Sequence, residues 1–425
     1  MNYSVLTILF GCFIQFASGQ EILTLQACLD KVENNSLQTA AESGLLNRSM
    51  IDRKFHWWIL LPDLSAGSGV NTSFGRRLDP FTNTFATSTV NSQSFGLNSS
   101  VQLFSGFSYF YKRNSLDASI RLNDIGLNEK LNSLRIQVIE IYIDLCKLSV
   151  QIQLTESRIE KFKQIQTIQR SLISEGRINA IDTLKSHNSV LVEQNQLLDL
   201  ANESKLKTIE LNFGIGSPLR TNYVFNPASI SEIKERPRFS EKFKVEALET
   251  ELELLQSQLK SDRSKNLPVI SMNGLVGTGF STNNKDYSLS GNPTKSYSDQ
   301  INQNLYEGIG FYLTIPIFNK GEWLKTKQLN EIQRTEIAIR KELAEYLLEK
   351  KQLEREQKLL NNKAKQEQIV QAANNLQMIY SKSLLLYEAG RLAYTEIETA
   401  LMDWQLKLSD YELLKIESEI LKLYE

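Results

Sequence analysis

The chain has 425 residues, and its 48 basic and 49 acidic side chains leave a formal net charge of −1. This near-neutral balance argues against a nucleic-acid partner, which needs a concentration of Lys and Arg. The length allows two or three domains, but the internal repeat described below favours one integrated fold.

The N-terminus has the pattern of an export signal. An apolar run over residues 5–16 precedes three small residues, which predicts a secretory signal peptide over residues 1–19. The usual basic start is missing, since no Lys or Arg precedes Lys31. A lipid anchor on Cys12, which ends a lipobox-like LFGC, is an open alternative.

Two cysteines remain after the predicted cleavage, Cys28 and Cys146. We expect two buried free thiols, although an export compartment would permit a disulfide. Beyond the signal, no apolar stretch reaches the roughly 20 residues that a membrane-spanning helix needs.

Two long tracts lack proline and are rich in Leu, Ile, Glu, Gln and Lys, which favour helices. They predict long helices over residues 108–175 and 322–388, each about 100 Å long at 1.5 Å per residue. Shorter helices are predicted over 178–212, 238–265 and 392–425.

A glycine stands at the end of each predicted long helix. Gly390 in YEAGR is the only glycine after Glu322, and Gly176 stands in the similar SEGR. A glycine costs about 1 kcal/mol against Ala inside a helix, but it tolerates the positive φ of a helix-ending turn. We therefore predict hairpin tips at 176–177 and 389–391.

Short segments with a period of two precede each long helix. They predict four strands of about 10 to 12 residues, the length of a tilted transmembrane strand, over residues 63–74, 94–104, 268–280 and 307–318. In the second strand, Phe95, Leu97, Val101 and Leu103 are expected on one face.

Aromatic residues cluster at the strand ends, and we expect Trp57, Trp58 and Trp323 at a membrane interface. The connections 75–91 and 281–304 are polar and turn-rich, as the outer loops of membrane barrels are. A soluble β-hairpin beside a coiled coil is the alternative interpretation.

The two halves of the chain repeat one arrangement. Phe104 precedes Gly176 by the same 72 residues that separate Phe318 from Gly390. We predict a first repeat over 20–218, a linker over 219–237 and a second repeat over 238–425. Four strands cannot close a barrel, and a membrane tolerates no open sheet edge. Strands that span a membrane would therefore require several copies of the chain. Three copies would supply twelve strands.

The order, duplication and spacing of several motifs resemble the TolC family of outer-membrane efflux proteins over the whole mature length. The motifs are the two Leu-Pro strand entries, LFSGF, PIFNKGEW, LNFGIGSP, the SEGR and YEAGR tips, and LTLQACLDKVENNSLQTAAES at the mature N-terminus. FGRRLDPFTNTF is similar to the first outer loop of Bacteroidetes-type members.

The resemblance implies a mixed α/β fold and a homotrimer in the outer membrane, with a shared twelve-stranded β-barrel that continues into an α-helical periplasmic barrel. It also implies a passive exit duct for a tripartite efflux pump or a type I secretion system. The implied partners are outer-membrane lipid, a periplasmic adaptor of the membrane-fusion type and an inner-membrane transporter of RND or ABC type.

The resemblance further implies roles for individual residues. Gly176, Arg177, Gly390 and Arg391 correspond to the adaptor-docking tips. Asp182 and Tyr387 match a pair that latches the periplasmic entrance. Glu396 and Thr399 occupy the places of an acidic pore constriction, although Thr399 departs from the acidic pattern. A solvated helix face is the alternative interpretation for Asp182 and Glu396.

No pattern of catalytic or metal-binding residues stands out, and no enzyme activity, cofactor or metal is expected. The two histidines, His56 and His187, lack metal-ligand spacing. GLVGTG over 274–279 opens no helix, so it lacks the context of a nucleotide-binding loop. A secreted coiled-coil scaffold is the main alternative to the duct.

Overall fold

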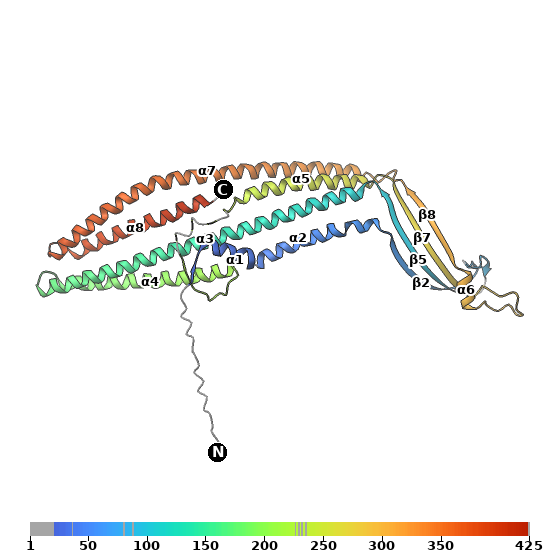
Figure 1. The fold of residues 1–425 in the computed structure, drawn as a ribbon, viewed down its shortest axis with the longest axis horizontal. Helices are drawn as coiled ribbons and strands as arrows, with labels where there is room; N and C mark the ends of the chain where they lie inside the picture. The colour runs from blue at the N-terminus through green and yellow to red at the C-terminus, as the bar shows by residue number, and fades with distance from the viewer. Residues whose placement is uncertain are drawn as a thin grey trace, which may run out of the picture. The chain divides into compact units, whose positions relative to one another are not determined.

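A computed structural model describes residues 21–35, 37–79, 81–86, 89–225, 227, 230, 233 and 236–423 (Figure 1). The predicted signal peptide and Cys12 lie outside these residues, and so does part of the predicted linker. The chain forms two compact units. Unit 1 comprises the described residues of Met1–Ala41, Asn128–Lys242 and Tyr346–Glu425, and unit 2 comprises those of Glu42–Leu127 and Phe243–Glu345. Each unit therefore combines segments of both sequence halves.

Unit 2 contains an antiparallel sheet with strand order β2-β5-β7-β8. The strands are β2 (Asp63–Ser73), β5 (Val90–Ser105), β7 (Val269–Ser281) and β8 (Tyr306–Thr314). Since β2 and β8 are the outermost strands, each presents one backbone edge with no partner strand among the described residues.

Four helices are each joined to one strand and follow the same order in unit 2, which contains their parts nearest the sheet, residues 42–55, 108–127, 243–264 and 322–345. The helices are α2 (Leu37–Phe55), α3 (Ser108–Ser174), α5 (Ser240–Ser264) and α7 (Glu322–Glu388). Ion pairs connect neighbouring helices: Arg53 with Asp117 at 2.6 Å, Arg121 with Glu253, and Arg340 with Glu251 at 2.9 Å.

The strand register gives the sheet two chemically different faces. Directly paired residues of antiparallel strands lie on the same face, and these pairs include Leu97 with Val276 and Met272 with Phe311. Such pairs extend one apolar face across the sheet, which we call face A; it contains Leu64, Ala66, Val70, Phe95, Leu97, Val101, Met272, Val276, Ile309, Phe311 and Leu313. The opposite face B is mostly Ser, Asn and Gly, with Tyr306 and Tyr312.

Two details of the strand prediction are wrong. The register shifts between Gln102 and Phe104, so Phe104 takes the place on face A that was expected for Leu103. A β-bulge adds one residue and reverses the alternation beyond it. Strand β8 ends at Thr314 rather than at 318, because Pro316 has no N–H to continue the ladder.

The connections between strands contain structure that the sequence analysis missed. The segment after β2 forms a short hairpin of β3 (Arg77–Leu78) and β4 (Phe85–Ala86). The segment before β8 contains the helix α6 (Tyr297–Gln303), whose N-cap is Ser296. The Ser296 Oγ accepts a hydrogen bond from the Asp299 N–H at 3.2 Å, a cap that SYSD indicates.

Unit 1 contains the helical hairpins, in which α3 returns as α4 (Ala180–Gly214) and α7 returns as α8 (Tyr394–Leu423). At the chain start, β1 (Glu21–Leu23) pairs in parallel with β6 (Tyr223–Phe225) and leads into α1 (Leu25–Asn35). Among the described residues, no helix has the length and apolarity required to cross a bilayer.

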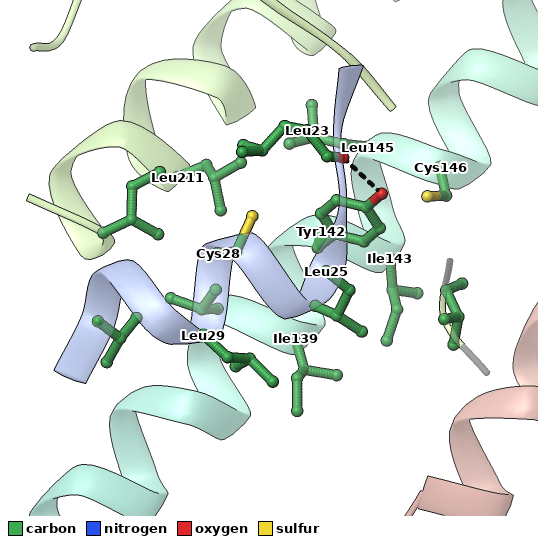
Figure 2. Close-up of a cluster of buried hydrophobic side chains, with 14 of the residues drawn as sticks. Leu23, Leu25, Cys28, Leu29, Ile139, Tyr142, Ile143, Leu145, Cys146 and Leu211 are labelled. Atoms are coloured by element: carbon green, nitrogen blue, oxygen red, sulfur yellow. Dashed lines mark hydrogen bonds between the residues drawn. The ribbon is translucent and has the colours of Figure 1, made fainter. Parts of the chain in front are cut away.

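A hydrophobic core joins α1, α3, α4, α8 and the β1–β6 pair in unit 1 (Figure 2). Tyr142 of α3 is fully buried in it and donates a hydrogen bond to the Leu23 carbonyl of β1 at 2.9 Å. Cys28 and Cys146 lie in the same core as free thiols, as expected. Burial raises the pKa of each thiol to about 12, so both remain protonated.

Two glycines give opposite expectations for stability. Gly106, between β5 and α3, has φ +64°, and an added Cβ would lie 2.6 Å from the Ser264 carbonyl oxygen. Gly106→Ala should therefore destabilise the protein by at least the ~1–2 kcal/mol of left-handed backbone strain. Gly126→Ala, inside α3 with no atom within 4 Å of the added Cβ, should stabilise it by about 1 kcal/mol. Urea unfolding followed by circular dichroism measures both, and equal midpoints would contradict this backbone assignment.

Candidate functional site

The two hairpin tips have the same backbone structure. Gly176 and Gly390 have φ values of +74° and +65°. These positive values are the ones predicted for glycine turns at the hairpin tips. One residue later, the Arg177 N–H donates to the Leu172 carbonyl at 2.9 Å, and the Arg391 N–H donates to the Leu386 carbonyl at 2.9 Å. This bond back across five residues closes the helix ends as a Schellman motif.

The tips contact each other through Arg177. A Cβ on Gly390 would lie 3.3 Å from the Arg177 Cδ and 3.5 Å from its Cβ. The exposed guanidinium of Arg177 pairs with Glu175 at 3.2 Å, and Arg391 is also exposed. A glycine at 390 therefore provides both the turn conformation and the space for the Arg177 stem.

A hydrophobic cluster holds the two hairpins together near the tips. It contains Tyr380, Tyr387 and Tyr394, which are spaced by seven residues along α7 and α8 and pack with Phe162 and Ile165 of α3. Burial raises the pKa of all three phenols, and for Tyr394 the nearby Glu398 carboxylate adds to the rise.

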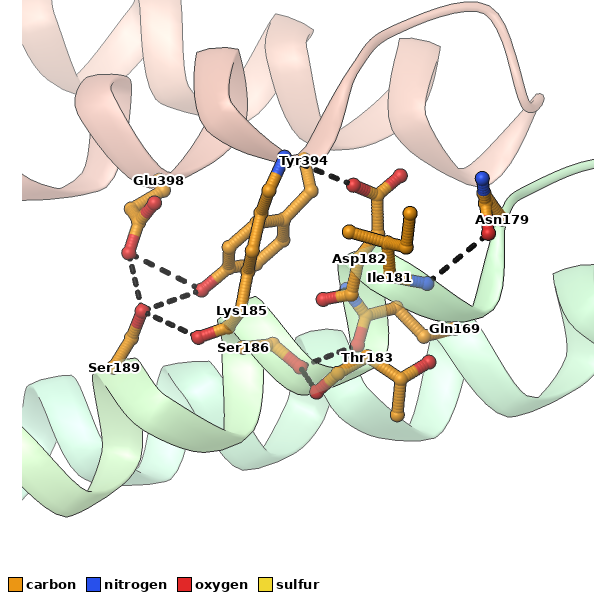
Figure 3. A network of polar contacts seen from close by, with 10 residues as sticks. All are labelled: Gln169, Asn179, Ile181, Asp182, Thr183, Lys185, Ser186, Ser189, Tyr394 and Glu398. Carbon is orange, nitrogen blue, oxygen red and sulfur yellow. Dashed lines mark hydrogen bonds and ion pairs between the residues drawn. The ribbon is translucent and has the colours of Figure 1, made fainter.

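A small polar contact crosses this cluster from α8 to α4 (Figure 3). The Tyr394 hydroxyl lies 3.0 Å from the Ser189 Oγ and 3.3 Å from the Glu398 Oε1, and the Ser189 hydroxyl donates to the same carboxylate. We call Ser189, Tyr394 and Glu398 the tip contact. It is a direct side-chain hydrogen-bonded connection between the first and second hairpins.

A cation on aromatic rings adds a second connection between the hairpins. The Lys161 ammonium of α3 lies 5.6 Å from the Tyr380 ring centroid and 5.2 Å from that of Trp404. These two rings stack on each other with centroids 5.4 Å apart. Such an ammonium–ring contact is worth about 0.5–2 kcal/mol.

The proposed latch residues lie near each other, but no direct hydrogen bond joins them. Tyr387 is fully buried, and its hydroxyl makes no hydrogen bond of normal geometry to a residue that the structure describes, although it lies near the Gln169 side chain. Asp182 forms an ion pair with Lys185 at 3.5 Å. Burial raises the pKa of Tyr387, the Gln169 side chain opposes this rise, and the Asp182 charge adds to it. Gln169 of α3 also reaches α4, with its amide nitrogen 3.3 Å from the Asp182 carbonyl and its Oε1 2.6 Å from the Ser186 Oγ.

The residues assigned to the pore constriction lie on one exposed side of α8. Glu396 and Thr399 are both exposed, and the Thr399 hydroxyl donates to the Thr395 carbonyl at 2.8 Å. Asp403, seven residues after Glu396, is exposed on the same helix face. The sequence analysis missed Asp403, although its heptad spacing from Glu396 is a visible signal.

The aromatic residues assigned to a membrane interface lie at one end of the sheet. Trp57 and Trp58 belong to the 3-10 segment η1 (His56–Leu60) directly before β2, and they are 48% and 55% exposed. Trp323, in the first turn of α7, is half-buried. Within the part of the chain that the structure describes, no three His, Cys, Asp or Glu side chains converge to hold a metal ion.

The chain matches no protein-family model and no curated protein, but it is similar to solved channel structures. The transmembrane channel protein CusC is 14% identical, with a TM-score of 0.77 over 95% of this chain and 91% of that chain. The outer membrane protein VceC of Vibrio cholerae is 11% identical, with a TM-score of 0.70 over 94% of each chain. The open state of the Neisseria gonorrhoeae MtrE outer membrane channel is 14% identical, with a TM-score of 0.63 over 94% and 87%. The chain therefore has the fold of these outer-membrane channels, as the resemblance to the TolC family predicted.

The two buried tyrosines near the tips should respond differently to loss of their hydroxyls. Tyr394→Phe removes the hydroxyl that bonds to Ser189 and Glu398 and leaves only the Ser189–Glu398 bond of the tip contact, so it should cost about 1–3 kcal/mol of unfolding free energy, because a carboxylate takes part. Tyr387→Phe removes a buried hydroxyl that only approaches Gln169 without normal hydrogen-bond geometry, so its loss of stability should be smaller. Denaturant unfolding of both variants is the measurement, and a loss confined to Tyr387→Phe would contradict the described geometry.

Proposed function

We propose that this protein is the outer-membrane exit duct of an export machine. Three copies would pool their sheets into one barrel, and substrates would pass through it without an energy source in the duct itself. The two-faced sheet with open edges carries this proposal, and the fold shared with outer-membrane channels supports it.

The chemistry of the sheet fits a barrel wall in a membrane. Face A is apolar and largely exposed, with Ile309 78%, Phe311 69% and Leu313 62% exposed on β8. Face B is rich in Ser, Asn and Gly, which suits a water-filled lumen. The free edges of β2 and β8 would pair between copies, since lipid leaves no unpaired backbone edge.

The outermost helices of unit 2 carry exposed apolar residues that fit the same assembly. Helix α7 exposes Leu329, Ile332, Ile339 and Leu343, which occupy a and d positions of a heptad pattern. Helix α2 exposes Leu45, Ile51 and Phe55. Because α2 continues into β2 and β8 continues into α7, strand pairing between copies would also bring these helix faces together.

The hairpin tips would form the periplasmic entrance. We propose that Gly176, Arg177, Gly390 and Arg391 dock a periplasmic adaptor, which would connect the duct to an inner-membrane transporter of RND or ABC type. The tip contact would hold the entrance closed together with Asp182 and Tyr387, and Glu396 and Thr399 would line its narrowest part. Trp57, Trp58 and Trp323 would lie at the membrane interface.

A secreted coiled-coil scaffold is the alternative function. It would leave face A in water, and an exposed apolar face of this extent is uncommon in soluble monomers. The scaffold also gives no reason for the separation of apolar and polar residues on the two faces of the sheet.

Neighbouring residues of β8 separate the two functions. Phe311→Arg places a charge on face A and should abolish stable membrane insertion, because Arg on a lipid-facing barrel wall costs about 2–4 kcal/mol near the bilayer centre. Tyr312→Arg on face B is the matched control and should be tolerated. The amount of trimer in outer-membrane fractions is the measurement. Equal amounts from both variants would contradict a lipid-facing face A, and wild-type protein absent from these fractions would favour the soluble scaffold.

Conductance of the purified protein in planar bilayers tests the entrance. The double variant Ser189→Ala with Tyr394→Phe should open more often than wild type, because the tip contact no longer joins the hairpins. Ser381→Ala is the control, since this exposed hydroxyl bonds only within α7. Asp182→Asn in the same assay tests the predicted latch separately. Unchanged conductance in the double variant would show that the tip contact does not hold the entrance closed.

A further inference from the structure

We propose that unit 2 binds the phosphate groups of anionic phospholipids with a basic collar at the helix-bearing end of the sheet. The proposal rests on the proposed membrane function and adds a lipid partner class to it. The collar consists of the Lys and Arg residues in the four segments that join helices to strands at that end, residues 53–62, 106–115, 258–268 and 315–327.

The register places these four segments at one end of the sheet. Asp63, at the start of β2, pairs with Ser100 near the end of β5. Ser105 pairs with Val269, and Val269 pairs with Thr314. The four segments adjoin these strand ends and therefore share one end of the sheet in unit 2 (Figure 1).

The charge at this end is strongly one-sided. The four segments contain ten Lys or Arg and two Asp or Glu, whereas the loops 74–89 and 282–305 at the opposite end contain four and three. The strands between the two ends carry only Asp63 and Glu307. The excess of positive charge is therefore confined to the helix-bearing end.

Four of the ten basic side chains are clearly available to a ligand, whereas Arg53 pairs with Asp117 at 2.6 Å. Lys112, Arg113, Lys325 and Lys327 are exposed, and none forms an ion pair with a residue that the structure describes. By contrast, Lys265 pairs with Asp262 at 2.6 Å within its own segment.

One of these side chains lies where its own helix disfavours a cation. Lys325 is in the first turn of α7, and the helix dipole disfavours positive charge there. An external anion would offset this cost.

A lipid surface is the anion source that fits the surroundings. The exposed segment 55–61 contains Phe, two Trp, Ile and two Leu directly beside the collar, and Trp rings prefer the headgroup region of a bilayer. Lys and Arg just outside such a belt attract anionic headgroups, and each contributes about a fivefold gain in affinity.

The test uses the full-length mature protein in phosphatidylcholine vesicles that contain brominated phosphatidylglycerol. Bromine quenches tryptophan fluorescence, and Trp57, Trp58 and Trp323 adjoin the collar. We expect wild type to prefer brominated phosphatidylglycerol over brominated phosphatidylcholine by about tenfold at low salt. Added salt should reduce this preference by screening.

The collar variant Lys112→Gln, Arg113→Gln, Lys325→Gln, Lys327→Gln should lose most of the preference. Its matched control removes four exposed lysines from the later part of α7, as Lys358→Gln, Lys363→Gln, Lys365→Gln, Lys382→Gln, and should keep it. An equal loss in both variants, or no preference in wild type, would overturn the collar.

Bilayer conductance separates the two proposals. Wild-type protein that conducts but shows no preference for phosphatidylglycerol would overturn the collar and leave the duct standing. Wild-type protein that neither enters vesicles nor conducts would overturn the duct, and the collar with it.

Discussion

The open edges of β2 and β8 are the constraint on which the rest of the structure depends. A sheet with an apolar face A and a polar face B has two possible environments, a membrane wall around water or a buried layer. The four-stranded sheet leaves one backbone edge of β2 and one of β8 without a partner strand among the described residues. Most of the large apolar side chains of face A are exposed. Helices α2 and α7, which are joined to the edge strands β2 and β8, also expose apolar residues. Pairing with further copies would cover both the open strand edges and the exposed apolar faces of the helices.

The helical part could be predicted from the sequence to a large extent, and the local detail could not. Helix α7 begins and ends where the absence of proline and glycine indicated. The glycine turns followed from the need for positive φ at Gly176 and Gly390. The bulge beside Leu103 was not predictable, since the alternation Phe95, Leu97, Val101, Leu103 looks unbroken in the sequence and only the pairing with β7 reveals the extra residue.

The tip contact shows why site residues are harder to predict than elements. Tyr387 and Tyr394 are the same residue type, seven positions apart in one hydrophobic cluster. The hydroxyl of Tyr394 bonds to Ser189 of another hairpin, more than 200 residues away in the chain, whereas that of Tyr387 makes no hydrogen bond of normal geometry to a described residue. Spacing from the tip glycine selected Tyr387 and Asp182 but not Ser189 or Glu398. The difference arises from the packing of α8 against α4, which no local pattern encodes.

The proposed gate must also be weak enough to open, and the chemistry of the tip contact fits this requirement. The hydrophobic cluster keeps the hairpins in register, but apolar contacts are non-directional and tolerate sliding. The tip contact adds direction at a modest net energy, about 1–3 kcal/mol when a carboxylate takes part. Three copies in the proposed trimer would together hold the entrance with roughly 3–9 kcal/mol, which is within the range of free energy that protein association supplies. A few hydrogen bonds across an apolar seam would therefore give the proposed entrance a closed state that the binding energy of a docking partner could reverse.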